Sequence, residues 1–232
     1  PEAKAIAEAA GDWGRPAQRT DENIFAYNWS GRTGVDGLEG ATVGILGFGE
    51  IGAELARRLR PFRPARVLYS KRRRLPSSVE EELGLVYARQ DELVAASDFL
   101  CSLLPYYPET DHLIDGALLA AMKPGSFVAH CGSGSVIDEA ALAAAIRQGH
   151  LAGAALDTYE WEPIRPDNPL LPLARDPAMN VLLPPHPAAG APRPDRTRKG
   201  GARSDGFTNI LRMVNGEPLL NQLIPNPSVH WA

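Results

Sequence analysis

Short apolar segments alternate with amphipathic segments along the middle of the chain. The apolar runs are nearly continuous and end at Gly, Pro or polar residues, which is typical of strands buried on both faces of a parallel sheet. The predicted strands are residues 42–46, 67–69, 85–87, 99–104, 127–129, 154–156 and 181–183. Predicted helices lie between them, over residues 50–60, 76–83, 91–96, 115–122 and 139–148. This alternation predicts an α/β fold with a doubly wound parallel sheet.

A glycine cluster follows the first predicted strand. Gly47, Gly49 and Gly52 have the G-x-G-x-x-G spacing of a dinucleotide-binding turn. Gly47 would allow the sharp turn, Gly49 would let a pyrophosphate approach the backbone, and Gly52 would let the next helix pack closely on the strand. The amides and the positive dipole end at the start of that helix would then face the phosphates.

The same spacing also occurs in glycine-rich turns of other α/β proteins. Two further features favour the dinucleotide interpretation. Ile51, Leu55 and Leu59 recur four residues apart, which predicts an apolar helix face directly after the glycines. The second strand, 67–69, then ends in a charged segment about 20 residues beyond the glycines, where a Rossmann-type fold places the residue that contacts the ribose. Together these features predict a Rossmann-type sheet.

Composition narrows the classes of function. The 232 residues are 44% hydrophobic and 22% charged, and the net charge of −4 provides no general basic surface for nucleic acid. Cys101 and Cys131 have neither a metal-site nor a C-x-x-C spacing, which predicts a reducing, cytoplasmic setting with no disulfide and no metal site. There is no apolar run of membrane-spanning length and no signal-peptide pattern, so we expect no membrane partner.

The pattern divides the chain into three predicted parts. Residues 1–37 form a helix and a connecting arm, residues 38–190 the dinucleotide-binding domain, and residues 191–232 a loop with a final amphipathic helix over 207–214. The chain starts at Pro1 inside the first predicted helix, so we expect it to be truncated at its N-terminus. The arm contains aromatic residues that we expect to be anchors on the domain or on a partner subunit: Trp13, Phe25, Tyr27 and Trp29.

Six short segments carry a family resemblance. They are Val43–Gly52, Pro108–Thr110, Met122–Gly125, Gly134–Glu139, Gly153–Asp157 and Pro185–His186. In order and spacing they resemble the NAD(P)-binding domain of the D-2-hydroxyacid dehydrogenases, the family that includes formate dehydrogenase, phosphonate dehydrogenase and glyoxylate/hydroxypyruvate reductase. The resemblance implies an NAD(P)-dependent oxidoreductase that acts on the CH–OH group of a small 2-hydroxy acid. In the other direction it would reduce a 2-keto acid of the glyoxylate or hydroxypyruvate type.

The resemblance also implies catalytic roles. His186 falls at the position of the general acid/base, which suits an imidazole because its pKa lies near neutral pH. Glu162 falls at the position of the carboxylate that orients this histidine and raises its pKa. Glu160 is a near neighbour that could hold this role instead. Asp157, after its strand, matches the residue that holds the nicotinamide carboxamide.

One catalytic position departs from the family. The family has an arginine that binds the substrate carboxylate, and Ser133 stands in its place. A hydroxyl cannot supply the charged fork of a guanidinium. Either another cation replaces it, or the substrate differs, or the activity is weak. The preceding His130, where the family often has asparagine, could compensate or could have a structural role.

The segment after the second strand bears on the choice of cofactor. In the family an acidic residue there accepts the ribose hydroxyls, whereas here Lys71 begins a basic run, Lys71–Arg74. Because cations attract a 2′-phosphate, we predict NADP(H) as the preferred cofactor, with NAD(H) possible. The alternative is a solvated or general anion-binding face. The resemblance implies these cofactor-binding residues: Gly47, Phe48, Gly49, Glu50, Ile51, Gly52, Ser70, Lys71, Arg72, Leu104, Pro105, Cys131, Gly132, Asp157, His186 and Ala188.

Two hypotheses about function follow. Family members have an N-terminal substrate domain that finds no counterpart here, so we expect this domain to be largely absent and the helix 207–214 to expose an apolar face. The first hypothesis is a 2-keto acid reductase that forms a homodimer, as the family does. The second is a dinucleotide-binding module without efficient catalysis, a sensor or subunit, which Ser133 and the absent domain favour. A nucleotide-binding methyltransferase is disfavoured by the segments Pro185–His186 and Gly153–Asp157.

Overall fold

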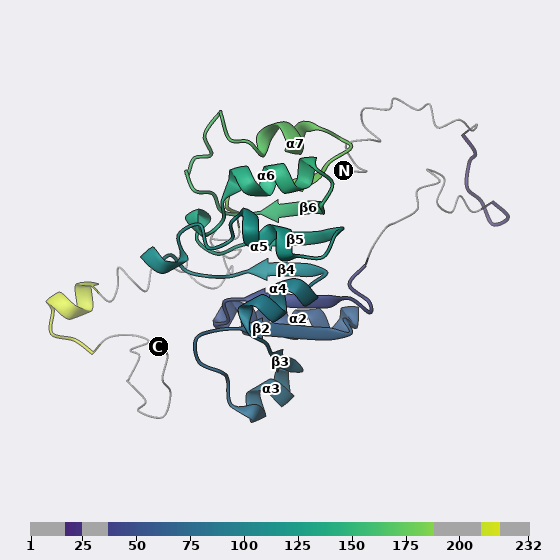
Figure 1. The fold of residues 1–232 in the computed structure, drawn as a ribbon. Coiled ribbons are helices and arrows are strands. Elements are labelled where there is room, and N and C mark those ends of the chain that lie inside the picture. The colour runs from purple at the N-terminus through teal and green to yellow at the C-terminus, as the bar shows by residue number, and fades with distance from the viewer. Residues whose placement is uncertain (1–16, 25–36, 188–209, 219–232) are drawn as a thin grey trace. The chain divides into compact units, whose positions relative to one another are not determined.

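The computed structural model describes residues 17–24, 37–187 and 210–218 (Figure 1). The predictions for the first helix, the aromatic residues of the arm, Ala188 and residues 207–209 lie outside these ranges. Contacts group the chain into two units, residues 1–185 and 186–232, which we describe separately. The first unit contains the sheet.

The described strands form one seven-stranded parallel sheet in the order β3-β2-β1-β4-β5-β6-β7. The chain winds outward from β1 to β3 and then returns to the other side of β1 with β4, so the order reverses between β1 and β4. This topology confirms the predicted Rossmann-type fold and places its switch point beside β1. The strands are β1 Thr42–Leu46, β2 Arg66–Ser70, β3 Leu85–Tyr87, β4 Phe99–Ser102, β5 Ser126–His130, β6 Leu151–Leu156 and β7 Asn180–Leu182.

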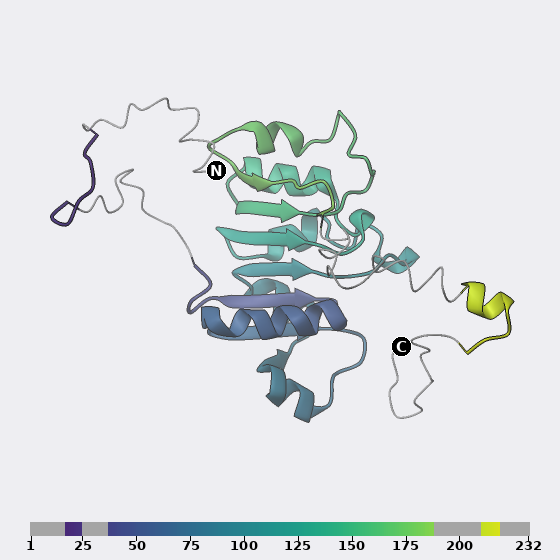
Figure 2. The same cartoon turned by 180° about the vertical axis from the view of Figure 1, so that it is seen from behind.

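Helices pack on both faces of the sheet. In Figure 1, α4, α5 and α6 lie in front of the strands, and Figure 2 shows α2 in front of the opposite face. The helices are α2 Glu50–Leu59, α3 Ser77–Leu83, α4 Gln90–Ala96, α5 Gly116–Ala121, α6 Glu139–Arg147 and α7 Leu171–Arg175. Three 3₁₀ turns are η1 Arg60–Phe62, η2 Pro108–Thr110 and η3 Gly134–Val136.

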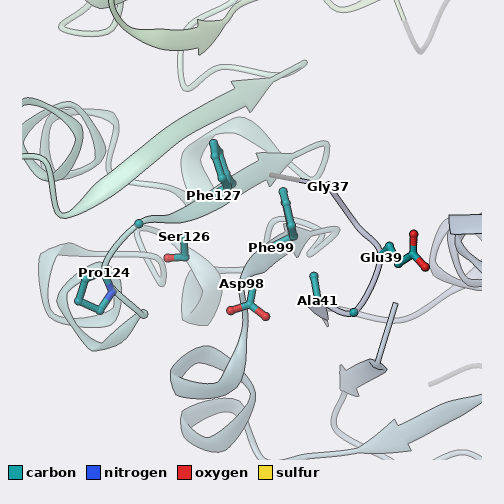
Figure 3. Close-up of a pocket in the computed structure, with 10 residues that line it drawn as sticks. Gly37, Glu39, Ala41, Asp98, Phe99, Pro124, Ser126 and Phe127 are labelled. Carbon is teal, nitrogen blue, oxygen red and sulfur yellow. The ribbon is translucent and has the colours of Figure 1, made fainter. Parts of the chain in front are cut away.

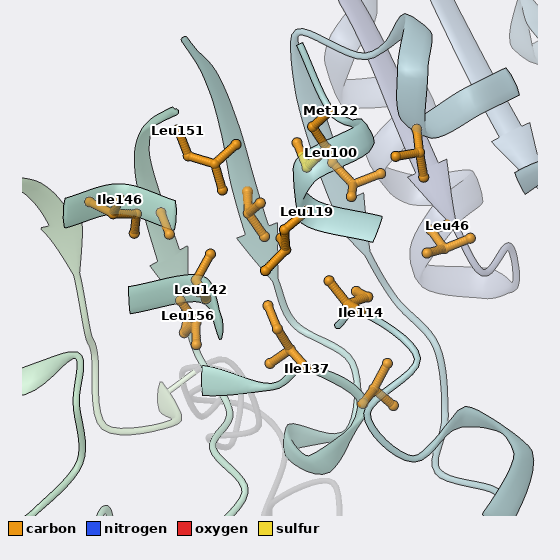
Figure 4. Packing of buried hydrophobic residues seen from close by; sticks show 14 of the residues in the cluster. Leu46, Leu100, Ile114, Leu119, Met122, Ile137, Leu142, Ile146, Leu151 and Leu156 are labelled. Atoms are coloured by element: carbon orange, nitrogen blue, oxygen red, sulfur yellow. The ribbon is translucent and has the colours of Figure 1, made fainter. Parts of the chain in front are cut away.

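Each face of the sheet has its own apolar cluster. The larger cluster lies under α4 to α7 and includes Leu100, Leu119 and Leu142, all without exposed surface (Figure 4). The smaller cluster, under α2 and α3, includes Ile45 and Tyr69. Because side chains alternate between the faces of a strand, two covered faces require apolar residues at successive positions. This explains the continuous apolar runs of the sequence.

Local capping interactions mark the bounds of α6 as predicted. The Asp138 carboxylate accepts hydrogen bonds from the amides of Ala140 and Ala141, each at 2.9 Å. Gly149, after the helix, adopts φ +74°, the left-handed conformation that glycine reaches without a Cβ clash. Such an N-cap contributes about 1 kcal/mol.

The structure corrects one position of the predicted apolar face of α2. Ile51 is 64% exposed, whereas Gly52, Ala56 and Leu59 are buried against the sheet. The helix approaches β1 through its small residues, and this turns the preceding Ile51 outward. Leu59 is buried and Leu55 is partly buried against the smaller cluster, so the four-residue spacing indicated the helix and two of its three core-facing positions. Only Ile51 was wrongly assigned to the buried side.

Other differences concern the ends of the elements and the second unit. β4 stops at Ser102, two residues before its predicted end, and the short helix α7 was not predicted. In the second unit, residues 210–214 are helical, and Ile210, Leu211 and Val214 are exposed as expected. Within the described ranges, no helix combines the length and the apolar character needed to cross a bilayer.

Candidate dinucleotide site

Gly47 forms the turn at the carboxyl end of β1. Its φ of +85° lies in the left-handed region. A Cβ atom at this position would also lie 2.9 Å from the Leu104 amide nitrogen. Glycine is thus required both by the backbone and by the close approach of the loop that follows β4, on the other side of the switch point.

The first turn of α2 is open toward solvent. Gly49 is its N-cap residue, and no side chain caps the amides there. A Cβ atom on Gly49 would meet nothing within 4 Å, and the neighbouring Glu50 and Ile51 are exposed. Uncapped amides at the positive end of a helix dipole are suited to binding a phosphate.

Phe48 has a structural side chain. Its ring is buried, with its centroid 5.1 Å from that of Tyr69, and a Cβ atom on Gly52 would lie 2.9 Å from the ring. Gly52 therefore leaves room for Phe48 between helix and sheet. Any contact of Phe48 with a cofactor is restricted to its backbone.

The cations after β2 have different environments. Lys71 is half-buried at the strand end, directly after the buried Ser70, while Arg72 and Arg73 are exposed. The Arg72 guanidinium carbon lies 5.5 Å from the centre of the Tyr107 ring, at a distance suited to a cation–π contact. Tyr107 belongs to the segment after β4.

Arg74 is engaged within the fold. Its Nε and Nη2 atoms donate to the two carboxylate oxygens of Glu80, each at 2.8 Å. Glu80 is buried on α3, and its pKa is lowered to about 2 by Arg74 and, to a smaller extent, by the Tyr69 hydroxyl. The carboxylate is thus ionised at neutral pH. This corrects the view of Lys71–Arg74 as one basic face, because Arg74 is engaged by Glu80.

Hydrogen bonds join the loops that follow β4, β5 and β6. The Ser133 amide donates to the Leu104 carbonyl, and the Ser133 hydroxyl accepts from the Tyr106 amide, both at 2.9 Å. The Thr158 hydroxyl donates to the Gly132 carbonyl at 2.7 Å. The predicted cofactor residues Leu104 and Gly132 are therefore brought together, and the hydroxyl at the family's arginine position holds a backbone amide.

His130 does not provide the missing cation. Its side chain is fully buried, and Nε2 lies 3.1 Å from the Ser133 carbonyl oxygen. Burial lowers the pKa of His130 to about 4, although the hydrogen bond to Ser133 acts in the opposite direction. The imidazole is neutral at physiological pH, which favours the structural alternative for this residue.

The two candidate carboxylates lie in the segment after β6. Glu162 is exposed, and one of its oxygens accepts a hydrogen bond from the Tyr159 amide at 3.0 Å. Glu160 is also exposed, and its carboxylate lies 3.7 Å from Nε2 of His112. His186 begins the second unit and adopts φ +51°. Its pairing with Glu162 stays a prediction.

The remaining predicted contacts stand at strand ends. Asp157 is buried directly after β6, and its amide donates to the His130 carbonyl at 2.9 Å. Cys131 is exposed after β5, and partial burial and the charge of Asp157 raise the pKa of its thiol. The thiol is therefore protonated at neutral pH. Pro105 is exposed after β4.

The segment that carries Glu162 has a buried anchor that its sequence does not reveal. Glu139, at the start of α6, accepts a hydrogen bond from the Asn168 side chain at 2.6 Å and another from the Glu160 amide at 3.2 Å. Both Glu139 and Asn168 are buried, and burial raises the pKa of Glu139. A glutamate in a first helical turn is ordinary, so only its partner 29 residues away reveals the role.

A pocket of about 340 Å³ lies at the opposite edge of the sheet, beside the starts of β1, β4 and β5 (Figure 3). Asp98 in its lining is hydrogen-bonded to the Lys123 ammonium and to the Thr42 amide, each at 2.7 Å. Ligands of such sheets bind at the carboxyl ends of the strands. The pocket is thus separate from the candidate site.

A family model described as the NAD binding domain of D-isomer specific 2-hydroxyacid dehydrogenase matches residues 10–188. The chain belongs to this family. The match includes the glycine turn, the basic loop after β2 and the loops that follow β4, β5 and β6. The resemblance inferred from the six segments is thereby confirmed.

Individual relatives support this membership. The chain is 41% identical to the glyoxylate reductase of Korarchaeum cryptofilum (strain OPF8) over 77% of this chain and 50% of the relative. It is 34% identical to the glyoxylate/hydroxypyruvate reductase B of Cronobacter sakazakii (strain ATCC BAA-894) over 91% of this chain and 63% of that relative. The solved structure of a glyoxylate reductase from Paecilomyes thermophila matches with a TM-score of 0.66 and 33% identity. This match covers 84% of this chain and 56% of that chain. The chain therefore spans between half and two thirds of the length of these relatives.

Proposed function

We propose that this chain is the dinucleotide-binding part of an NAD(P)-dependent oxidoreductase that reduces a small 2-keto acid or oxidises the corresponding 2-hydroxy acid. The observation that carries the proposal is the glycine turn at the switch point. Gly47 forms that turn against the Leu104 backbone, and the uncapped start of α2 faces solvent beside it. The relatives named glyoxylate reductase support the same substrate class.

The residues at this edge fit a nicotinamide dinucleotide. The amides at the start of α2 would hold the pyrophosphate, and Asp157, buried at the end of β6, would hold the carboxamide. The bound cofactor supplies hydride transfer. In the proposed mechanism His186 gives a proton to the keto oxygen, or takes it from the hydroxyl, and Glu162 orients the imidazole.

The proposal includes a preference for NADP(H) over NAD(H). Lys71 and Arg72 would pair with the 2′-phosphate, which NAD(H) lacks. Since both are accessible at the end of β2, each charge contact should add to the salt dependence of binding.

A second candidate function is a dinucleotide-binding module without efficient catalysis. The Ser133 hydroxyl holds the Tyr106 amide, and His130 is neutral. The loop after β5 thus lacks the cation that would bind a substrate carboxylate. This observation favours a sensor or subunit role.

Fluorescence titration of the chain with NADPH and with NADH tests cofactor binding without requiring turnover. We expect tighter binding of NADPH that weakens as salt rises. Lys71→Gln and Arg72→Gln should each weaken NADPH binding, because each removes one charge contact to the 2′-phosphate. NADH lacks this phosphate, so its affinity should change by less than about twofold. Arg73→Gln is the matched control. Equal affinity for the two cofactors would contradict the preference, and binding of neither would contradict the site.

Reduction of glyoxylate and hydroxypyruvate separates the two functions. The first predicts NADPH oxidation that depends on either keto acid, and a gain in kcat/KM for Ser133→Arg. Tight cofactor binding without turnover in both proteins would favour the module. His186→Gln is the control for general acid/base catalysis, since it should abolish any turnover.

We also propose a homodimeric, cytoplasmic protein whose parts are residues 1–37, 38–190 and 191–232. Family membership supports the dimer. Light scattering of the purified chain tests the dimer, and a mass of one chain at micromolar concentration would contradict it.

A further inference from the structure

Two buried side chains, Tyr69 and Glu80, form hydrogen bonds with each other and with the exposed Arg74 at the end of the basic loop. We call Tyr69, Glu80 and Arg74 the Tyr69–Glu80–Arg74 triad. The Tyr69 hydroxyl donates to one oxygen of Glu80 at 2.6 Å, and Arg74 donates to both oxygens at 2.8 Å. The Leu75 amide in turn donates to the Tyr69 hydroxyl at 2.8 Å. Each member of the triad is therefore hydrogen-bonded to another.

The triad is attached to a rigid part of the fold. Tyr69 lies in β2 with no exposed surface, and its ring lies 5.1 Å from that of Phe48 and 5.5 Å from that of Tyr87. Packing on both sides leaves its hydroxyl one position. Glu80, on α3, is 7% exposed. The far end of the loop, at Arg74 and Leu75, is thus tied back to the strand from which the loop departs.

This attachment restricts the three residues between the two ends. Lys71 follows the last residue of β2, and Arg74 is held by Glu80, so Lys71–Arg73 span a short distance between two anchored points. Arg74 and Glu80 neutralise one another. The Arg74–Glu80 pair therefore adds no net charge, and the positive charge of the loop comes from Lys71–Arg73.

One contact shows that the loop after β2 lies over the carboxyl end of β1. Arg72 lies 5.5 Å from the ring of Tyr107, which follows β4. β2 and β4 are the two neighbours of β1. A contact between their following segments must pass across the end of β1, where Gly47 makes the dinucleotide turn. The anchored loop therefore stands over the candidate site.

We propose that the Tyr69–Glu80–Arg74 triad is a positioning device for cofactor choice, which holds Lys71 and Arg72 where the 2′-phosphate of NADP(H) binds. This inference rests on the proposed function, because it presumes that those two cations select NADP(H). None of the three triad residues contacts the cofactor in this role.

The variant Glu80→Gln separates positioning from charge by the sign of its effect. If Glu80 acted only through its charge, its removal would free Arg74 and add positive potential, so NADPH would bind more tightly. If the triad positions the loop, the loss of the charged pair releases the loop, and NADPH binds more weakly. We expect the Kd for NADPH to rise about 3- to 10-fold, as for the loss of one or two hydrogen bonds, with NADH changed less than twofold.

Tyr69→Phe tests the same device at constant charge. It removes the hydrogen bonds to Glu80 and from Leu75 while the ring can remain packed, and it should lower the NADPH preference in the same direction. Glu81→Gln, an exposed carboxylate on the same helix, is the matched control. Thermal unfolding by circular dichroism reports whether each variant is folded at the temperature of the titration.

The outcomes distinguish this inference from the proposed function. If Lys71→Gln lowers the NADPH preference but Glu80→Gln and Tyr69→Phe do not, the triad is only structural and the inference is wrong while the function stands. Tighter NADPH binding by Glu80→Gln also overturns it. If the unaltered chain binds NADPH and NADH equally and Lys71→Gln changes neither affinity, the proposed cofactor choice is wrong, and the inference that rests on it is wrong as well. A preference lowered by both triad variants, with Glu81→Gln unchanged, supports the inference.

Discussion

The loops after β2 and after β5 leave the same edge of the sheet and are held in opposite ways. The loop after β2, Lys71–Leu75, is anchored by a charged pair, Arg74 and Glu80, and presents exposed cations. The loop after β5, Cys131–Ser135, has no charged residue and is held by backbone groups and hydroxyls, such as the Ser133 bond to Tyr106. The first loop thus presents charge, whereas the second presents backbone groups and hydroxyls without charge.

Close packing is what gives the second loop its shape. A Cβ atom on Gly132 would lie 2.5 Å from the Leu104 carbonyl oxygen, and one on Gly134 would lie 1.8 Å from that of Tyr159. The exposed side chains of the first loop meet no such restriction. Changes in the second loop should therefore affect folding, and changes in the first should affect ligand selection.

The largest expected effect is that of Gly134→Ala. Its methyl group has no space beside the Tyr159 carbonyl, so we expect a loss of about 3 kcal/mol in the free energy of unfolding, at the upper end of overpacking effects. Urea denaturation measures it. Gly116→Ala is the control, because its Cβ would meet Ala141 at an ordinary 3.8 Å. Equal stability of the two variants would show that the loop can shift at little cost.

His130 should make stability depend on pH at the second loop. Its folded pKa of about 4 lies below the ordinary 6.5, so between these values the unfolded chain binds a proton that the folded chain does not. Stability should therefore fall as pH decreases from 6.5 to 4, by about 3 kcal/mol for this group. His130→Asn should remove this part of the decrease, measured by urea denaturation across the range. His112→Gln removes an exposed imidazole as the control, and an unchanged slope in His130→Asn would refute the assignment.

Ser133→Ala should have a moderate effect. It leaves the Tyr106 amide without its acceptor at an exposed position, so we expect a loss of about 1 kcal/mol of stability and little change in cofactor affinity. Ser135→Ala, in the same loop, is the matched control. A large loss of NADPH binding in Ser133→Ala would instead assign this hydroxyl to the ligand.

The smallest expected effect is acid sensitivity at the first loop. The folded pKa of Glu80, about 2, lies below its ordinary 4.5, so the stability from this group is present above pH 4.5 and is lost as pH falls toward 2. Its partner Arg74 is 63% exposed, and solvent screening reduces the effect. Glu80→Gln should reduce the pH dependence of the free energy of unfolding between pH 4.5 and 2. It should leave the pH dependence between 6.5 and 4, which His130 causes, unchanged. If Glu80→Gln changed the pH dependence only between pH 6.5 and 4, the assignment of the two pH ranges to the two loops would be wrong.

The fold followed from the sequence because its signals are local. The apolar runs, the glycine turn at Gly47 and the cap at Asp138 each act within a few residues, so a single sequence reveals them. The site was assigned to one sheet edge by the same kind of argument, since parallel strands end together, and this assignment stays a prediction. The family match adds to this but does not test the individual site residues.

The partners of the site residues were decided by tertiary structure. The sequence does not distinguish Arg74 from the neighbouring cations, and only the buried Glu80 beside it does so. Ser133 likewise pairs with an amide 27 residues away. Ile51 matched the apolar period, yet close packing at Gly52 turned it outward. Sequence spacing determined which segments form strands and turns, because those preferences are local. Only the packing of loops from different strands determined which side chains are engaged within the fold and which stay exposed.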